Sequence, residues 1–120
     1  MPNPLYDALI APHAANAAVF LQDDAGSSLT YADFVARSAQ MANVIAQAGI
    51  EPGDRIVVQT AKTIDSVPLY AGAVQSGAVY LPLNPAYTEA EVAYFVQDAT
   101  PRLIICDPAD TAAMLSLIHI

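Results

Sequence analysis

Residues 75–107, QSGAVYLPLNPAYTEAEVAYFVQDATPRLIICD, decide the fold of this chain. Two apolar runs, AVYLPL (78–83) and RLIIC (102–106), lie on either side of a turn and a helical pattern. Strand, helix and strand in this order form the crossover unit of a parallel sheet. The stretch therefore predicts an α/β fold with parallel strands.

The helix between the two runs has clear start and stop signals. Thr88 with Glu91 three residues later matches a capping box, and Pro101 cannot continue a helix. Pro82 has no N–H to donate, so it argues against a fully paired central position for the first strand.

The bend after that strand is the one feature that exceeds what packing demands. Pro82 and Pro85 flank Leu83 and Asn84, and this predicts a stiff connection of specific shape. Such bends often lie near ligands in α/β proteins, but a rigid connection into the helix is the simpler interpretation.

The alternation extends in both directions and gives the order β-α-β-α-β-α. The apolar positions 57, 80 and 104 mark three strand centres at nearly constant spacing. The expected further elements are a helix capped by Thr30 with Asp33 in an approximate capping box and ended by Gly49, a strand DRIVVQ (54–59), a helix capped by Ser66 with Pro68 in its first turn and stopped by Gly77, and a helix capped by Asp107 with Pro108 at its first position. A short helix (3–10) and a β-hairpin from AAVFLQ (17–22) and LTY (29–31) are expected before them.

The composition excludes several classes of function. The chain has 120 residues, 55% hydrophobic and 13% charged, with a net charge of −8. Its four bases, Arg37, Arg55, Lys62 and Arg102, are scattered, so no basic patch for a nucleic acid is expected. The apolar stretches are too interrupted for a membrane span, and no signal sequence is visible, so a cytoplasmic location is expected. The low charge suits a piece that packs against more protein.

No catalytic, cofactor-binding or metal-binding residue is expected in the chain. The glycines match no GxGxxG or GxxxxGK loop. The side chains that could carry chemistry have simpler structural roles: a buried thiol, a surface imidazole, two helix-start carboxylates and packing aromatics. They are Cys106, His13, Glu89, Glu91, Tyr80, Tyr87, Tyr94 and Phe95.

Two motifs resemble a known superfamily. LTYADF (29–34) followed by SGAVYLPLNPAY (76–87) is similar to the early core motifs of adenylate-forming enzymes, and the likeness covers about residues 4–114. That superfamily includes acyl- and aryl-CoA synthetases, peptide-synthetase adenylation domains and luciferases. PLNPAYT (82–88) looks more like acyl-CoA synthetases, since peptide-synthetase domains tend to carry Asp where Asn84 stands. The whole combination is most similar to the malonyl-CoA synthetase branch.

This resemblance implies an incomplete N-terminal part of the large domain of an AMP-binding ligase. The parent enzyme would use ATP, Mg²⁺ and coenzyme A to activate a small carboxylate, first as an acyl adenylate and then as a thioester. The phosphate loop, ATP-binding motifs, hinge and catalytic lysine of that family are absent from this chain. The chain alone is therefore expected to be an inactive scaffold that binds none of these cofactors and lacks the rest of its own domain.

The last six residues, LSLIHI (115–120), are expected not to belong to the native protein. One DNA string that would encode them, CTGTCTCTTATACACATC, is a transposase end sequence used in preparing sequencing libraries. The expected division is thus 1–114 as a truncated AMP-binding portion and 115–120 as an adapter-derived tail.

Two other interpretations of the function stay open: a complete small α/β ligand-binding or interaction module without catalysis, and the start of a peptide-synthetase adenylation domain.

Overall fold

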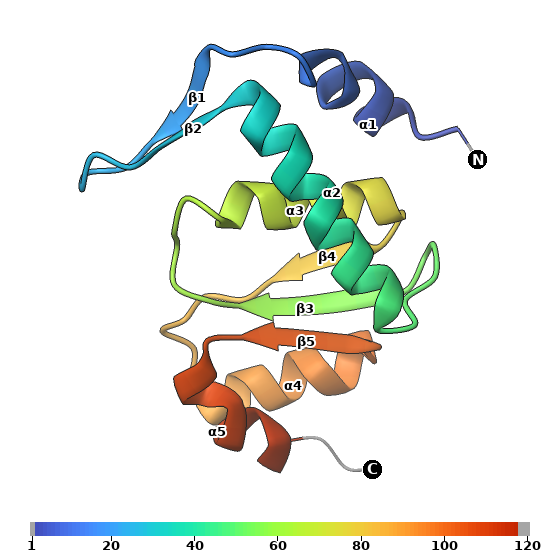
Figure 1. Ribbon diagram of the computed structural model, residues 1–120. Coiled ribbons are helices and arrows are strands. Elements are labelled where there is room, and N and C mark those ends of the chain that lie inside the picture. Colours follow the sequence, from blue (N-terminus) through green and yellow to red (C-terminus); the bar gives the residue numbers. More distant parts are fainter. Residues whose placement is uncertain (1, 118–120) are drawn as a thin grey trace.

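A parallel three-stranded sheet forms the centre of the computed structural model, which describes residues 2–117 (Figure 1). Its strands are β3 (Arg55–Gln59), β4 (Val79–Pro82) and β5 (Leu103–Cys106), in the order β4-β3-β5. In register, Val57 of β3 lies beside Leu81 of β4 and Ile104 of β5. The predicted parallel α/β fold is confirmed. Pro82 ends an edge strand, as its missing N–H requires.

Helices cover both faces of the sheet (Figure 1). The α-helices are α1 (Pro4–Leu9), α2 (Tyr31–Gln47), α3 (Ser66–Ser76), α4 (Glu89–Ala99) and α5 (Thr111–Ser116), and the 3₁₀ turns are η1 (Ala11–His13) and η2 (Pro108–Asp110). Because side chains alternate along a strand, β3 serves two cores. Ile56 and Val58 pack with Ile45 of α2 and Ala73 of α3. Val57, between them, packs on the opposite face with Val92 of α4 and Met114 of α5.

The predicted hairpin is also confirmed. β1 (Val19–Gln22) and β2 (Ser28–Thr30) pair antiparallel and form a separate two-stranded sheet. Leu29 of the hairpin packs with Ile10, Phe34 and Ala71 in a third apolar cluster. The hairpin and α1 are thereby held against α2 and α3.

Local signals set most helix ends where the sequence predicts them. The Thr30 hydroxyl accepts a hydrogen bond from the Asp33 N–H at 3.0 Å, which is the first half of a capping box. Thr88 and Glu91 form the complete box at the start of α4. Gly77 ends α3 with φ +74°, a left-handed conformation that glycine adopts without steric cost.

One predicted helix start is wrong by one residue, and a second is confirmed only in part. Ser66 is the first residue of α3 instead of its cap, because its hydroxyl accepts from the Thr63 N–H at 2.9 Å and closes the preceding loop. Asp107 holds the predicted cap position with Pro108 next to it, but it caps the 3₁₀ turn η2, and its side chain makes no capping hydrogen bond. Its carboxylate accepts from the Ala61 N–H at 3.0 Å, while residues after it form η2 before α5 begins at Thr111. In both cases a side chain bonds a loop instead of the helix.

Helices α2 and α3 approach very closely at Gly72. A methyl group added there would lie 2.7 Å from Met41 Cβ and 2.9 Å from the Ser38 carbonyl oxygen. Ser38 is fully buried at this crossing, and its hydroxyl donates to the Phe34 carbonyl at 2.7 Å. Small residues therefore set the distance between the two helices.

The end of the described chain packs on the face of the sheet that α4 also covers. Leu117 follows α5 and contacts the cluster that contains Met114, whereas Leu115 is mostly exposed. Residues 118–120, half of the expected adapter-derived tail, lie outside the described residues. Within residues 2–117, every helix falls short of the length and apolar character needed to cross a membrane.

Candidate functional site

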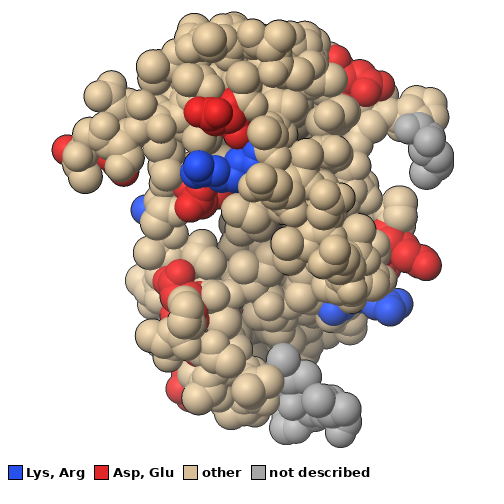
Figure 2. Space-filling view, in the orientation of Figure 1, with Lys and Arg blue, Asp and Glu red and all other residues tan. Residues whose placement is uncertain are grey.

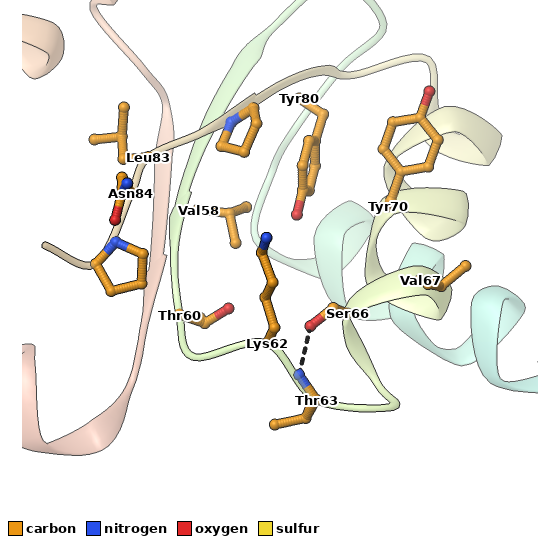
Figure 3. A pocket seen from close by; sticks show the side chains of 12 residues that line it. Val58, Thr60, Lys62, Thr63, Ser66, Val67, Tyr70, Tyr80, Leu83 and Asn84 are labelled. Carbon is orange, nitrogen blue, oxygen red and sulfur yellow. Dashed lines mark hydrogen bonds between the residues drawn. The ribbon is translucent and has the colours of Figure 1, made fainter. Parts of the chain in front are cut away.

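A hollow of about 610 Å³ opens where β3 and β4 end (Figure 3). Its walls come from three segments: the loop that follows β3, the first turns of α3, and the bend after β4. In parallel α/β proteins, ligands bind beyond the carboxyl ends of the strands because the variable loops meet there. This hollow is therefore the candidate functional site of the described chain.

The proline-flanked bend forms one wall of the hollow and is firmly held. The Leu83 N–H donates to the Val58 carbonyl at 2.8 Å, and the Leu83 side chain is buried. The Gln59 amide donates to the Asn84 carbonyl at 3.0 Å. The Asn84 side-chain oxygen accepts from the Ala86 N–H at 2.9 Å. Backbone and side-chain bonds thus fix the bend to the end of β3.

Only one of the four candidate aromatic residues lines this hollow. Tyr80 lies in its wall with Tyr70, and the two rings meet edge to face at 5.2 Å. Burial raises the pKa of the Tyr80 hydroxyl above its usual value, so this hydroxyl stays neutral and can donate a hydrogen bond at neutral pH. Tyr87 borders a smaller hollow of about 190 Å³ and stacks on Phe95. Tyr94, at 64% exposed, lines neither.

Lys62 is the candidate side chain of this hollow that the sequence analysis did not single out. It is the one charged residue among the twelve that line the hollow. In Figure 3 its ammonium group points into the hollow, toward Val58 and the Tyr80 hydroxyl. A signal was present: Lys62 is one of four bases in a chain of net charge −8, and it follows directly after the most buried strand.

Two of the other three bases pair with carboxylates, whereas Arg55, like Lys62, takes part in no ion pair among the described residues. Figure 2 shows a face dominated by uncharged side chains, on which basic groups lie beside acidic ones. Arg37 bonds Asp65 at 2.7 Å, and Arg102 lies 4.0 Å from Asp54. Lys62 takes part in no ion pair with another described residue. It is therefore available to a ligand.

The remaining candidates have structural surroundings. Cys106 is half-buried and packs against the apolar cluster that contains Val57, Val92 and Met114. His13 lies 4.9 Å from the Tyr31 ring, and Glu91 completes the cap of α4, where Glu89 is the first residue. Within residues 2–117, no group of three metal-ligating side chains comes together.

Comparison with known proteins places the chain in a family. A family model described as AMP-binding enzyme matches residues 10–119. The chain belongs to the AMP-binding enzyme family. The match spans most of the chain, and it confirms the resemblance to the adenylate-forming superfamily that the motifs LTYADF and SGAVYLPLNPAY indicate.

The solved structures give the same fold with high similarity. ATP-bound MatB from Rhodopseudomonas palustris is 36% identical with a TM-score of 0.91, over 98% of this chain and 23% of that one. A fatty acyl CoA synthetase from Mycobacterium tuberculosis is 25% identical with a TM-score of 0.71, over 77% of this chain and 18% of that one. The described fold is thus that of the N-terminal part of an adenylate-forming domain.

Curated relatives include peptide synthetases. The isonitrile lipopeptide synthase of Streptomyces coeruleorubidus is 34% identical over 87% of this chain and 7% of its own length. The non-canonical peptide synthetase CymA of Salinispora arenicola is 33% identical over 84% of this chain and 1% of its own length. The chain therefore spans a small share of every relative named here. The comparisons therefore show membership of the AMP-binding enzyme family for a chain that covers a small part of its relatives.

Proposed function

We propose that the protein from which this chain derives is an AMP-forming carboxylate–CoA ligase, similar to malonyl-CoA synthetase. The observation that carries the proposal is the likeness to MatB, which extends over 98% of this chain at 36% identity. The sequence PLNPAYT (82–88), with Asn84 in the bend, supports a CoA ligase over a peptide synthetase.

The proposed reaction has two steps. A carboxylate oxygen of the substrate attacks the α-phosphate of ATP, which forms an acyl adenylate and releases pyrophosphate. The thiol of coenzyme A then attacks the acyl carbon and releases AMP. Mg²⁺ would neutralise charge on the phosphates during the first step.

We propose that the groups that hold Mg²⁺–ATP lie in the part of the parent enzyme outside this chain. Two observations support this: residues 2–117 bring no three metal-ligating side chains together, and the sequence contains no GxGxxG or GxxxxGK loop. We assign no catalytic residue to this chain. Its role is to provide the sheet, the helices on both faces and the fixed bend on which the rest of the large domain is built.

We propose the division of the chain that the motifs predict. In this proposal residues 1–114 are the N-terminal portion of the AMP-binding domain and residues 115–120 derive from a sequencing adapter; the family match through residue 119 and the packing of Leu117 against the core count against the second part. The missing phosphate loop and the short share of MatB that the chain spans support a longer native protein.

A second candidate is the start of a peptide-synthetase adenylation domain. The 34% and 33% identities to the two synthetases favour it, since they approach the 36% identity to MatB. Such a domain would pass its acyl group to the phosphopantetheine of a carrier protein instead of free coenzyme A.

The test is a pair of assays on the protein encoded by the complete genomic reading frame. Thioester formation is measured by mass spectrometry with malonate, acetate or butanoate plus ATP, Mg²⁺ and coenzyme A. Exchange of pyrophosphate into ATP is measured with the twenty amino acids. A CoA thioester with a carboxylate supports the proposal. Amino-acid-dependent exchange without any CoA thioester overturns it in favour of the second candidate.

A further inference from the structure

The hollow at the ends of β3 and β4 has an unusual charge balance for this protein. The chain carries 12 acidic and 4 basic residues, yet the hollow is lined by one lysine and no carboxylate. Lys62 is itself exposed, so water screens its charge, and the hydroxyl and apolar groups that line the hollow must supply the rest of the attraction for a ligand. The balance therefore favours an anionic ligand.

The nearby carboxylates are already engaged or face elsewhere. Asp65, three residues from Lys62, bonds Arg37 at 2.7 Å. Asp107 accepts from the Ala61 N–H at 3.0 Å on the far side of the loop. Asp23 borders a neighbouring hollow of about 400 Å³ that Lys62 also touches, and its carboxylate accepts from the Ser27 N–H at 2.8 Å. Asp23 is thus the one carboxylate that could compete for Lys62.

Hydroxyl donors surround the lysine. Tyr80 points its hydroxyl toward the Lys62 ammonium, and Thr60 lies on the opposite wall (Figure 3). Ser66 shares the site, although its oxygen already accepts from the Thr63 N–H at 2.9 Å. An ammonium group with neutral hydroxyls is a donor set suited to carboxylate or phosphate oxygens.

The rest of the wall is apolar. Val58 is buried at the base, Leu83 is buried in the bend, and the Tyr70 and Tyr80 rings close one side. A bare inorganic ion would leave this surface in contact with water. The wall fits a ligand that carries a short apolar or amide-containing chain next to its charged group.

We propose that this hollow binds the oxyanion group of an amphipathic small molecule, a carboxylate or a phosphate ester, with Lys62 as the charged contact and Tyr80 as a hydroxyl donor. The proposal goes beyond the proposed ligase function and depends only on the residues that line the hollow. Binding in the hollow can therefore succeed or fail whichever acyl acceptor the parent enzyme uses.

The experiment is a titration of the ¹⁵N-labelled 120-residue chain at constant ionic strength, followed by amide chemical shifts. The probes are sodium butanoate, sodium acetate and inorganic phosphate, with chloride as the reference anion. We expect saturable shifts at residues 60–66 and 80–84, with dissociation constants on the order of millimolar for a single charged contact. Burial of two more methylene groups should make butanoate bind about tenfold more tightly than acetate.

Matched variants separate the site from general charge. Lys62→Met should weaken binding at least tenfold, and Lys62→Arg should restore most of it. Arg55→Met, which removes an exposed base at the opposite end of β3, should change nothing. Asp23→Asn should leave binding equal or stronger, since it removes the competing carboxylate.

Each result decides the proposal. Acetate and inorganic phosphate both lack an apolar chain, so tighter binding of acetate than phosphate identifies a carboxylate ligand, and the reverse identifies a phosphate ester. Shifts that never saturate, or equal binding by the wild-type chain and Lys62→Met, overturn the proposal. The same holds if Arg55→Met weakens binding as much as Lys62→Met.

Discussion

Replacing Gly72 with alanine should lower the free energy of unfolding by about 2 kcal/mol, although alanine is the better helix former. Gly72 lies inside α3, where alanine would normally gain about 1 kcal/mol over glycine. Intrinsic propensity alone therefore predicts a more stable variant. The packing of α2 against α3 predicts the opposite sign.

The magnitude follows from the distances at the helix crossing. The added Cβ would lie 2.7 Å from Met41 Cβ, 2.9 Å from the Ser38 oxygen and 3.0 Å from the Ala42 nitrogen. Carbon atoms in favourable contact lie about 3.5–4.0 Å apart, so the helices must separate by about 1 Å. All three neighbours are backbone or Cβ atoms, which no rotamer change can move. Overpacking of this kind costs about 3 kcal/mol, and the helix preference of alanine offsets about 1 kcal/mol of it.

Urea unfolding followed by circular dichroism measures the effect. With a slope of about 1–2 kcal/mol per molar urea, the midpoint should fall by about 1–2 M. Ala36→Gly, at an exposed position of α2, calibrates the propensity term and should cost about 1 kcal/mol. A Gly72→Ala chain as stable as the wild type, or more stable, refutes the reasoning about the crossing.

Three further predictions concern caps, pH and exposed surface. Thr88→Ala should destabilise the chain by about 1 kcal/mol in urea, because it removes the capping box of α4, while Thr88→Ser should retain most of the stability; equal loss in both variants would argue against the cap. Because burial raises the pKa of Tyr80 in the folded state, its contribution to stability is complete below the unfolded pKa of about 10 and is lost as pH rises through the folded value. Tyr80→Phe should therefore flatten the decline in stability above about pH 10; identical pH profiles for wild type and Tyr80→Phe would contradict this. The 120-residue chain should bind a hydrophobic dye such as ANS, since Val44, Val79 and Leu9 are exposed and β4 is a sheet edge; a chain that melts cooperatively without enhancing dye fluorescence would show that these surfaces need no cover.

Signals that act within one element predicted most of the fold correctly. The capping box at Thr88, the left-handed Gly77 and the proline at the end of β4 each depend on a few neighbouring residues. The alternation of apolar runs and helical patterns then sufficed for the parallel order of the strands.

Contacts between distant elements account for what the sequence could not predict. The carboxylate of Asp107 bonds the Ala61 N–H, 46 residues away in the chain, and this contact replaces the expected capping hydrogen bond. Ser38 is buried because Gly72 brings α3 onto it, which no periodicity in α2 indicates. The hollow itself exists only because the loop with Lys62 and the bend with Asn84 follow neighbouring strands.

The central claim is that this chain is the N-terminal portion of an AMP-forming ligase. The measurement that tests it most directly is to read the gene from genomic DNA, without transposase cutting, through the codons for residues 114–120 and beyond. The account predicts that the frame leaves LSLIHI near Leu115 and continues into a Ser-, Thr- and Gly-rich loop that ends in lysine. A stop codon directly after Ile120 in the genome would contradict the account.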